Sequence, residues 1–221
     1  MTQPGPIPRR TIQRFSRYLR ELERLERDGV ETTSSAELGE LVGAGDAQVR
    51  RDLAFFGQLG QRGVGYSVKT LIEALRATLS LNHEWRVVLV GAGNVGRALC
   101  TYKVFRERGF RIVALFDNDP RKEGLTWARL KVQPMRELKK TVREQGIELG
   151  VIAVPPEAAQ DVADQLVAAG VRGILNFAPA RVRVPPGVQV CSADLAVEME
   201  QLAFLVANAD RQVPQRSNQR R

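Results

Sequence analysis

The stretch VVLVGAGNVGRALC, residues 87–100, decides the fold of this chain. Its first part has the composition of a buried strand, and its second part has the pattern of a helix. Between them stand Gly91, Gly93 and Gly96, in the spacing G-x-G-x-x-G. In this context the first glycine allows a tight turn, the second lets the backbone approach a pyrophosphate, and the third lets helix and strand pack closely. The stretch therefore predicts a dinucleotide site at the N-terminus of a helix.

A second apolar stretch, RIVALFD at 111–117, ends in Asp117. An acid about 20 residues after the glycines binds the adenosine ribose hydroxyls and repels a 2′-phosphate, which favours NAD(H) over NADP(H). Arg121 and Lys122 follow closely, and they leave two interpretations open, a 2′-phosphate contact or a solvated surface. The glycine pattern alone is weak, but the loop, the strand and the acid together predict dinucleotide binding.

The residues around this stretch alternate between strand and helix patterns. Strands are expected at 86–90, 111–116, 149–154, 172–177 and 187–191, and helices at 94–107, 134–145, 157–169 and 194–209. The intervening segments are long enough for helical crossovers, so we expect an α/β fold with a mostly parallel, doubly wound Rossmann sheet. We assign 81–192 to this domain, 193–210 to a C-terminal helix and 211–221 to a disordered tail.

Residues 1–80 are expected to form a separate helical domain, joined to the Rossmann domain within LNHEW, 81–85. In its first helix, which should end at Gly29, one face is apolar and another is basic. The apolar face contains Ile12, Phe15, Leu19 and Leu22, and the basic face contains Arg10, Arg14 and Arg17.

Two short helices and a glycine turn within about 17–56 match a helix-turn-helix. We expect Ser35 to cap the first helix, whose inward side chains are Leu38, Leu41 and Val42. The turn is GAG at 43–45, and we expect Asp46 to cap the second helix. In the second helix, Val49, Leu53 and Phe56 form one buried stripe, and Arg51 points away from it with Gln48 and Arg50 on the flanks. Arginine pairs with guanine and glutamine with adenine in a major groove. The alternative is an ordinary helical hairpin with a solvated face.

The segment GQRGVGYSV, about 60–68, resembles the wing of a winged helix, with Arg62 at its tip. An arginine there enters a minor groove or binds phosphate. Tyr66 is expected to pack in the core beneath the turn.

Composition limits the remaining possibilities. The chain has 221 residues, enough for two domains, and a formal net charge of +8. The charge favours nucleic acid or an anionic membrane as a partner, although an inert basic surface is an alternative. No apolar run approaches the ~18 residues of a membrane span, and no signal peptide is recognisable. Cys100 and Cys191 lie far apart in the sequence, and with the single His83 they are too few ligands for a structural zinc site. We therefore expect a cytoplasmic protein without a metal.

These motifs together resemble the Rex family of redox-sensing transcriptional repressors. The resemblance covers about 9–208 and is carried by YLRELERLE, TSSAELGEL, QVRRDLAFFGQLGQRGVGY, VGAGNVGRAL, FDNDP and VPPEAAQDVADQLVAAGVRGILNFAP, and by the helix from Asp194. It implies a homodimer of N-terminal winged helices and C-terminal Rossmann domains, with the last helix exchanged between subunits. It also implies binding to operator DNA, expected to be palindromic, and release by NADH, whereas NAD+ favours or permits binding.

The resemblance also implies roles for individual residues. DNA contacts are expected from Ser34, Ser35, Gln48, Arg50, Arg51 and Arg62. The adenosine diphosphate half of the cofactor is expected at Gly91, Ala92, Gly93, Asn94, Val95, Gly96, Asp117 and Asn118, and the nicotinamide side at Val154, Pro155, Asn176, Phe177 and Ala178. Tyr102 would respond to the nicotinamide, and Arg20 would pair with Asp194 in one state. The alternatives are a tyrosine packed against the partner helix and an aspartate that only caps its own helix.

Two other functions are compatible with parts of this sequence. A dinucleotide-dependent dehydrogenase with an appended helical domain needs a proton donor beside the nicotinamide. His83 lies before the first strand, Tyr102 and Lys103 remain conceivable, and no substrate-binding insertion is recognisable. A CoA-binding structural module is disfavoured by Asp117 and the winged helix. We expect no enzyme activity.

The C-terminal helix is apolar around much of its circumference, through Val197, Leu202, Ala203, Phe204, Leu205 and Val206. A surface helix needs only one apolar stripe. We therefore expect this helix to be buried between other elements.

Overall fold

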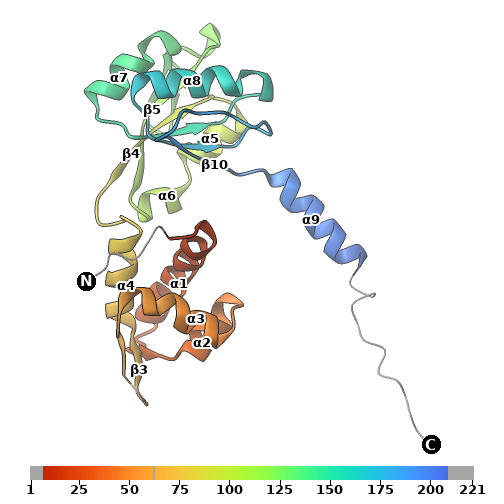
Figure 1. Ribbon diagram of the computed structural model, residues 1–221. Helices are drawn as coiled ribbons and strands as arrows, with labels where there is room; N and C mark the ends of the chain where they lie inside the picture. The colour runs from red at the N-terminus through yellow and green to blue at the C-terminus, as the bar shows by residue number, and fades with distance from the viewer. Residues whose placement is uncertain (1–6, 62, 209–221) are drawn as a thin grey trace, which may run out of the picture. The chain divides into compact units, whose positions relative to one another are not determined.

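The computed structural model describes residues 7–61 and 63–208. The chain divides into two compact units between Glu84 and Trp85, and each is described here by itself (Figure 1). The N-terminal unit is helical with a small sheet, and the C-terminal unit is built on a larger sheet with helices.

The N-terminal unit contains helices α1 (Arg9–Arg27), α2 (Ser35–Val42), α3 (Asp46–Leu53) and α4 (Val68–Thr78), and a 3₁₀ turn, η1 (Ala54–Phe56). Strands β1 (Thr32–Thr33), β2 (Gly60–Gln61) and β3 (Gly65–Ser67) pair antiparallel in the order β1-β3-β2. The core collects apolar side chains of all four helices, among them Phe15, Leu22, Leu38, Leu53 and Leu75. The β2–β3 hairpin is the predicted wing, and helix α4 was not among the predicted elements.

The turn between α2 and α3 depends on two glycines. Gly43 ends α2 with a φ of +68°, in the left-handed region that side chains disfavour. Gly39 lies where the helices meet, and a Cβ there would be 2.5 Å from the carbonyl oxygen of Ala44. The close approach of α2 and α3 therefore requires glycine at position 39.

Four sequence predictions in this unit were wrong in detail. The cap of α2 is Ser34 rather than Ser35: its hydroxyl accepts from the N–H of Glu37, whose carboxylate accepts from the N–H of Ser34, as in a capping box. Asp46 is the first residue of α3 and makes no side-chain cap. Ile12 and Leu41, expected inward, are 40% and 38% exposed among the described residues.

The C-terminal unit is a Rossmann-type sheet in the order β10-β9-β8-β4-β5-β7-β6. Its strands are β4 (Trp85–Val90), β5 (Phe110–Asp117), β6 (Thr126–Trp127), β7 (Leu130–Pro134), β8 (Leu149–Ile152), β9 (Gly173–Asn176) and β10 (Gln189–Ser192). All neighbouring strands are parallel except β6 and β7. The predicted parallel sheet is confirmed, and the β6–β7 hairpin was missed.

Helices cover both faces of this sheet. They are α5 (Asn94–Cys100), α6 (Lys103–Glu107), α7 (Leu138–Glu144) and α8 (Ala159–Ala169), with 3₁₀ turns η2 (Pro120–Lys122), η3 (Met135–Glu137) and η4 (Pro156–Ala158). Val88 and Val90 pack in one core with α7 and α8, whereas Val87 and Leu89 pack in a second core with Leu99 of α5. The single helix predicted at 94–107 was wrong, because Thr101 and Tyr102 interrupt it.

The last described helix, α9 (Leu195–Ala207), begins at Asp194, whose carboxylate accepts from the N–H groups of Ala196 (3.0 Å) and Val197 (3.4 Å). None of its residues is buried: Leu195 is 72% exposed and Phe204 is 65% exposed. The predicted tail at 211–221 lies outside the described residues.

Candidate nucleotide pocket and DNA-binding surface

The three glycines of the loop after β4 meet different surroundings. A Cβ on Gly96 would lie 1.9 Å from the carbonyl oxygen of Gly91, so this glycine allows α5 to start against the strand. Gly91 has a φ of +108°, and a Cβ there would lie 2.3 Å from the carbonyl oxygen of Ala153 in the neighbouring β8 loop. A Cβ on Gly93 would meet no atom of the described residues within 4 Å. Position 93 therefore faces open space, where the backbone is accessible to a ligand.

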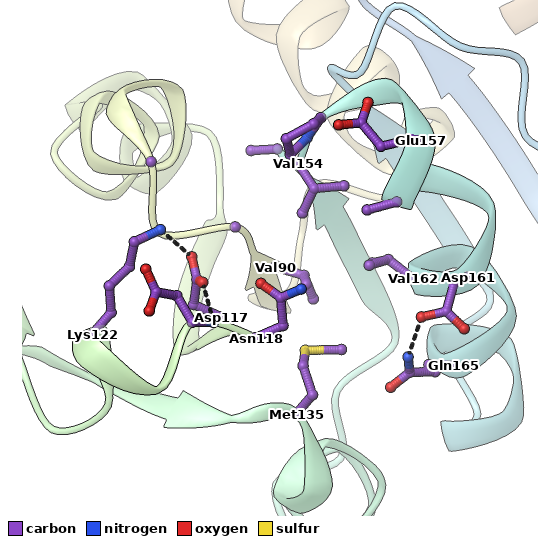
Figure 2. Close-up of a pocket in the computed structure, with 16 residues that line it drawn as sticks. Val90, Asp117, Asn118, Lys122, Met135, Val154, Glu157, Asp161, Val162 and Gln165 are labelled. Carbon is purple, nitrogen blue, oxygen red and sulfur yellow. Dashed lines mark hydrogen bonds and ion pairs between the residues drawn. The ribbon is translucent and has the colours of Figure 1, made fainter.

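A pocket of about 540 Å³ lies at the carboxyl ends of β4, β5 and β8 (Figure 2). Here the chain connects β4 to β5 on one side, while β8 lies on the other, and nucleotides bind at such switch points in open parallel sheets. The predicted residues that line it are Gly91, Gly93, Asp117, Asn118, Val154 and Pro155. Asp117, Asn118 and Lys122 stand on one side of the pocket, and Glu157, Asp161 and Gln165 stand on the other.

Asp117 is 8% exposed, and its carboxylate is closely held. It accepts from the N–H of Ala92 at 2.7 Å, the N–H of Asp119 at 2.8 Å and the ammonium of Lys122 at 2.9 Å. Burial alone would raise the pKa of Asp117, but Lys122 and the two backbone donors together lower it below the ordinary value. Asp117 is thus a fixed anion beside the glycine loop, and Lys122 is ion-paired rather than merely solvated.

Sequence reasoning missed several lining residues of this pocket. Met135 follows β7, whereas Glu157, Asp161, Val162 and Gln165 belong to the turn and helix that follow Pro155. The carboxylate of Asp161 accepts from the side-chain amide of Gln165 at 2.7 Å. The spacing of Asp161 and Gln165 places them on one helix face, but that this face lines the pocket depends on how α8 packs against the sheet.

The other predicted cofactor residues do not line this pocket. Ala92 is buried and donates to Asp117, and Asn94 and Val95 are exposed in the first turn of α5. Tyr102 is 51% exposed, with its ring edge-on to Phe105.

The loop after β9 is organised by a fully buried side chain. The amide of Asn176 donates to the carbonyls of Ala178 (3.1 Å) and Ala180 (2.8 Å) and accepts from the N–H of Ala178 (3.0 Å). These bonds use both ends of the Asn176 amide, and they shape the loop that carries Phe177 and Ala178.

In the N-terminal unit, a groove of about 810 Å³ runs between the start of α2, the end of α3 and the wing. It is lined by Ser34, Ser35, Arg50 and residues of the wing. Arg50 is ion-paired with Asp46 at 2.9 Å, and its guanidinium also donates to the hydroxyl of Ser35 at 3.5 Å. Serine hydroxyls, helix N–H groups and an arginine are the groups that hold a DNA phosphate.

The exposed face of α3 carries Arg51, and its guanidinium donates to the side-chain oxygen of Gln48 at 2.9 Å. Gln48 is half-buried and donates in turn to the buried carboxylate of Asp52 at 2.8 Å. Arg62 lies outside the described residues. The structure thus brings the predicted Ser35 and Arg50 together in the groove, and Gln48 and Arg51 on α3.

Of the predicted switch residues, Arg20 is exposed on α1 and Asp194 caps α9. Across residues 7–61 and 63–208, no group of three or more His, Cys, Asp or Glu side chains is placed to hold a metal ion. Within the same ranges, no helix is long and apolar enough to cross a membrane.

Two family models match the chain, "CoA binding domain" over residues 82–180 and "Putative DNA-binding protein N-terminus" over residues 6–54. The chain is 54% identical to the redox-sensing transcriptional repressor Rex of Carboxydothermus hydrogenoformans, over 90% of this chain and 95% of that protein. It is 46% identical to the Rex repressor of Streptomyces coelicolor, over 92% of this chain and 79% of that one.

Solved structures are similar as well. A crystal structure of RSP in complex with β-NAD+ and operator DNA has a TM-score of 0.87 at 33% identity, covering 94% of this chain and 95% of that chain. RSP in complex with β-NADH has a TM-score of 0.85 at 31% identity, covering 94% and 97%.

Proposed function

The chain belongs to the Rex family of redox-sensing transcriptional repressors, and we propose that it represses transcription by binding operator DNA and leaves that DNA when NADH occupies its Rossmann unit. NAD+ permits DNA binding. The observation that carries this proposal is the presence, in one chain, of a helix-turn-helix with a wing and of a glycine-loop pocket with an acid at the end of β5.

The pocket suits the adenosine half of a dinucleotide. Gly93 leaves room for a pyrophosphate beside the free N–H groups at the start of α5, and Asp117 stands where a ribose would be bound. The same carboxylate disfavours CoA, whose adenosine ribose carries a phosphate. We assign the adenosine diphosphate to Gly91–Gly96, Asp117 and Asn118, and the nicotinamide side to Val154, Pro155, Phe177, Ala178 and Tyr102, with Asn176 shaping the loop that carries Phe177 and Ala178.

The N-terminal unit supplies the contacts to DNA. Arg51 is assigned to a base edge in the major groove, because it is exposed on the outer face of α3. We assign a phosphate contact at the groove to Ser34, Ser35 and Arg50. Gln48 is assigned to a DNA contact on α3, beside Arg51. Arg62 is assigned to the DNA as the wing residue.

The exposure of α9 supports a homodimer. Its apolar side chains include Leu195, Met199, Phe204 and Val206, each more than half exposed. Contiguous apolar surface of this kind marks an interface. We assign α9 to exchange with a second copy, which implies two-fold symmetry and a palindromic operator. Arg20, Tyr102 and Asp194 are assigned to the switch between the two states.

We expect no catalysis, because the relatives are named transcriptional repressors. A repressor works where the chromosome lies, so the protein is expected in the cytoplasm. Moving a population from mostly bound to mostly released needs ~2–5 kcal/mol of differential binding.

The test begins with selection of a preferred site from a pool of randomised duplexes by the full chain. Binding to that duplex is then followed by fluorescence anisotropy in NADH, NAD+ or CoA. The proposal predicts release by NADH, retention in NAD+ and no response to CoA. Failure to select any site, or equal release by NADH and NAD+, would refute it.

A further inference from the structure

The N-terminal unit contains a buried carboxylate that lines neither the nucleotide pocket nor the groove beside the wing. Asp52, in α3, is 5% exposed and accepts four hydrogen bonds. Two come from the guanidinium of Arg14, the second at 2.8 Å, and one comes from the hydroxyl of Tyr18 at 2.9 Å, both in α1. The fourth comes from the side-chain amide of Gln48 at 2.8 Å. An ionised group in a core needs such partners.

The charge of this carboxylate is secured by its donors. Burial alone would raise the pKa of Asp52, but the hydrogen bonds from Arg14, Tyr18 and Gln48 together lower it below the ordinary value. Tyr18 is fully buried, and its own pKa is raised by burial and then by the bond to Asp52. The hydroxyl therefore remains a donor, and Asp52 is a permanent anion anchored to α1.

The contacts continue outward from this anion to the exposed face of α3. The nitrogen of the Gln48 amide is bound to Asp52, so its oxygen is directed the other way, where it accepts from Arg51 at 2.9 Å. The series Asp52–Gln48–Arg51 thus connects the core with the side chain that faces outward. Both ends of the Gln48 amide are engaged within the protein.

We propose that Asp52 is a positioning residue for DNA recognition, which fixes Gln48 so that Gln48 holds the guanidinium of Arg51 in its base-reading orientation. This inference rests on the proposed function, and it changes the role of Gln48 from a reader of adenine to the link that orients Arg51. An ordered arginine loses less side-chain entropy on binding, and its fork meets two acceptors of a guanine in one geometry. The link therefore acts on discrimination at the Arg51 position.

The experiment uses the full chain and the duplex that the parent protein selects from a randomised pool. Affinities for this duplex and for each single-base substitution identify the position at which Arg51→Ala loses discrimination. Gln48→Met keeps the length of a half-exposed side chain and removes both bonds. It should lower discrimination at that position roughly two- to tenfold, the effect of freeing one flexible side chain.

The double variant separates a link from a reader. If Gln48 acts through Arg51, then Gln48→Met in the Arg51→Ala background changes discrimination nowhere. In Asp52→Asn an amide N–H replaces one carboxylate oxygen and faces Arg14 in either orientation, because Arg14 donates to both oxygens. The side chain that holds Gln48 is thereby loosened, so this variant should weaken the same position as Gln48→Met. Gln13→Met, the same replacement at an exposed position of α1, is the matched control and should match the parent.

The results with Gln48→Met decide whether Gln48 orients Arg51 or reads a base itself. An independent loss of discrimination at another base in Gln48→Met, still present without Arg51, overturns the inference and makes Gln48 a reader. Parent-like discrimination in Gln48→Met also overturns it, whereas the proposed function survives both results. If the parent selects no site, the proposed function fails and the inference fails with it. Melting temperatures record any loss of stability in Asp52→Asn separately, and instability alone does not select one base position.

Discussion

Replacing single glycines of the loop by alanine should separate ligand binding from folding. At Gly93, a Cβ would meet no described atom within 4 Å, and the backbone is extended, with φ −96° and ψ −166°. Alanine restricts the unfolded chain more than glycine does, which adds about 0.4–1 kcal/mol of stability. Alanine is also a poorer N-cap than glycine, which removes a comparable ~0.5 kcal/mol or more. The two effects nearly cancel, so Gly93→Ala should change the melting temperature by less than ~3 °C.

The same methyl group should weaken NADH binding, because it enters the space reserved for the pyrophosphate. Overpacking of this kind costs about 1–3 kcal/mol, or roughly a 5- to 150-fold loss of affinity. Gly93→Val, with a larger side chain, should abolish the NADH response and leave DNA binding intact. At Gly96 the order reverses: a Cβ would lie 1.9 Å from a backbone oxygen, so Gly96→Ala should lose ~1–3 kcal/mol of stability and melt at a temperature several degrees lower.

Fluorescence titration of NADH and thermal melting of the same preparations measure the two effects. The reasoning is refuted if Gly93→Val binds NADH with the affinity of the parent. It is equally refuted if Gly93→Ala and Gly96→Ala lower the melting temperature by the same amount, because the two positions would then share the same surroundings.

Three further predictions follow from named contacts. Asp117→Ala removes the partner of Lys122 and leaves its ammonium free for a 2′-phosphate, so the preference for NADH over NADPH should fall by about 1.5–3 kcal/mol in calorimetry, and an unchanged preference would count against the ribose assignment. Arg51→Ala should cost ~1–3 kcal/mol of specific DNA binding with no change in NADH affinity, and parent-like binding to the selected duplex would exclude Arg51 as a reader. Arg20→Ala and Asp194→Ala, singly and together, should shift the NADH concentration that releases DNA, in a non-additive way; normal release with only a lower melting temperature in Asp194→Ala would leave Asp194 as a helix cap and no more.

Local patterns were sufficient to predict most of the sheet. The four consecutive buried residues Val87–Val90 and the acid-ended β5 are visible as apolar runs, and their order along the chain fixes a parallel arrangement. The β6–β7 hairpin was missed because its turn residues, Ala128 and Arg129, have φ of +46° and +69° without the glycine or asparagine that announces such a turn.

Helix boundaries were harder to predict than the helices themselves, in one case because the sequence carries no signal and in another because a signal was overlooked. The break between α5 and α6 occurs at Thr101 and Tyr102, with no proline or glycine to mark it. Ser34 and Ser35 were equally good caps by composition, and only Glu37 at the third helical position, which completes the capping box, distinguishes them.

The candidate site was predictable where one segment carries it and unpredictable where distant segments meet. The glycine loop and Asp117 could be identified from spacing, whereas Gln165 enters the pocket through the packing of α8. Asp52 looks like one more polar residue of α3, and its partner Arg14 lies in a different helix, so the buried ion pair is a tertiary feature. The periodicity of α1 shows only that Arg14 lies on a polar face. Its contact with Asp52 depends on how the two helices pack.

The central claim is that one pocket controls one DNA-binding surface, and linkage tests it most directly. The dissociation constant of NADH should be measured with and without a saturating amount of the selected duplex, beside the reverse measurement of duplex affinity with and without NADH. Because coupling is reciprocal, the account predicts that DNA weakens NADH binding by the same factor by which NADH weakens DNA binding, about 30- to 5000-fold for ~2–5 kcal/mol. An NADH affinity that the duplex leaves unchanged would contradict it.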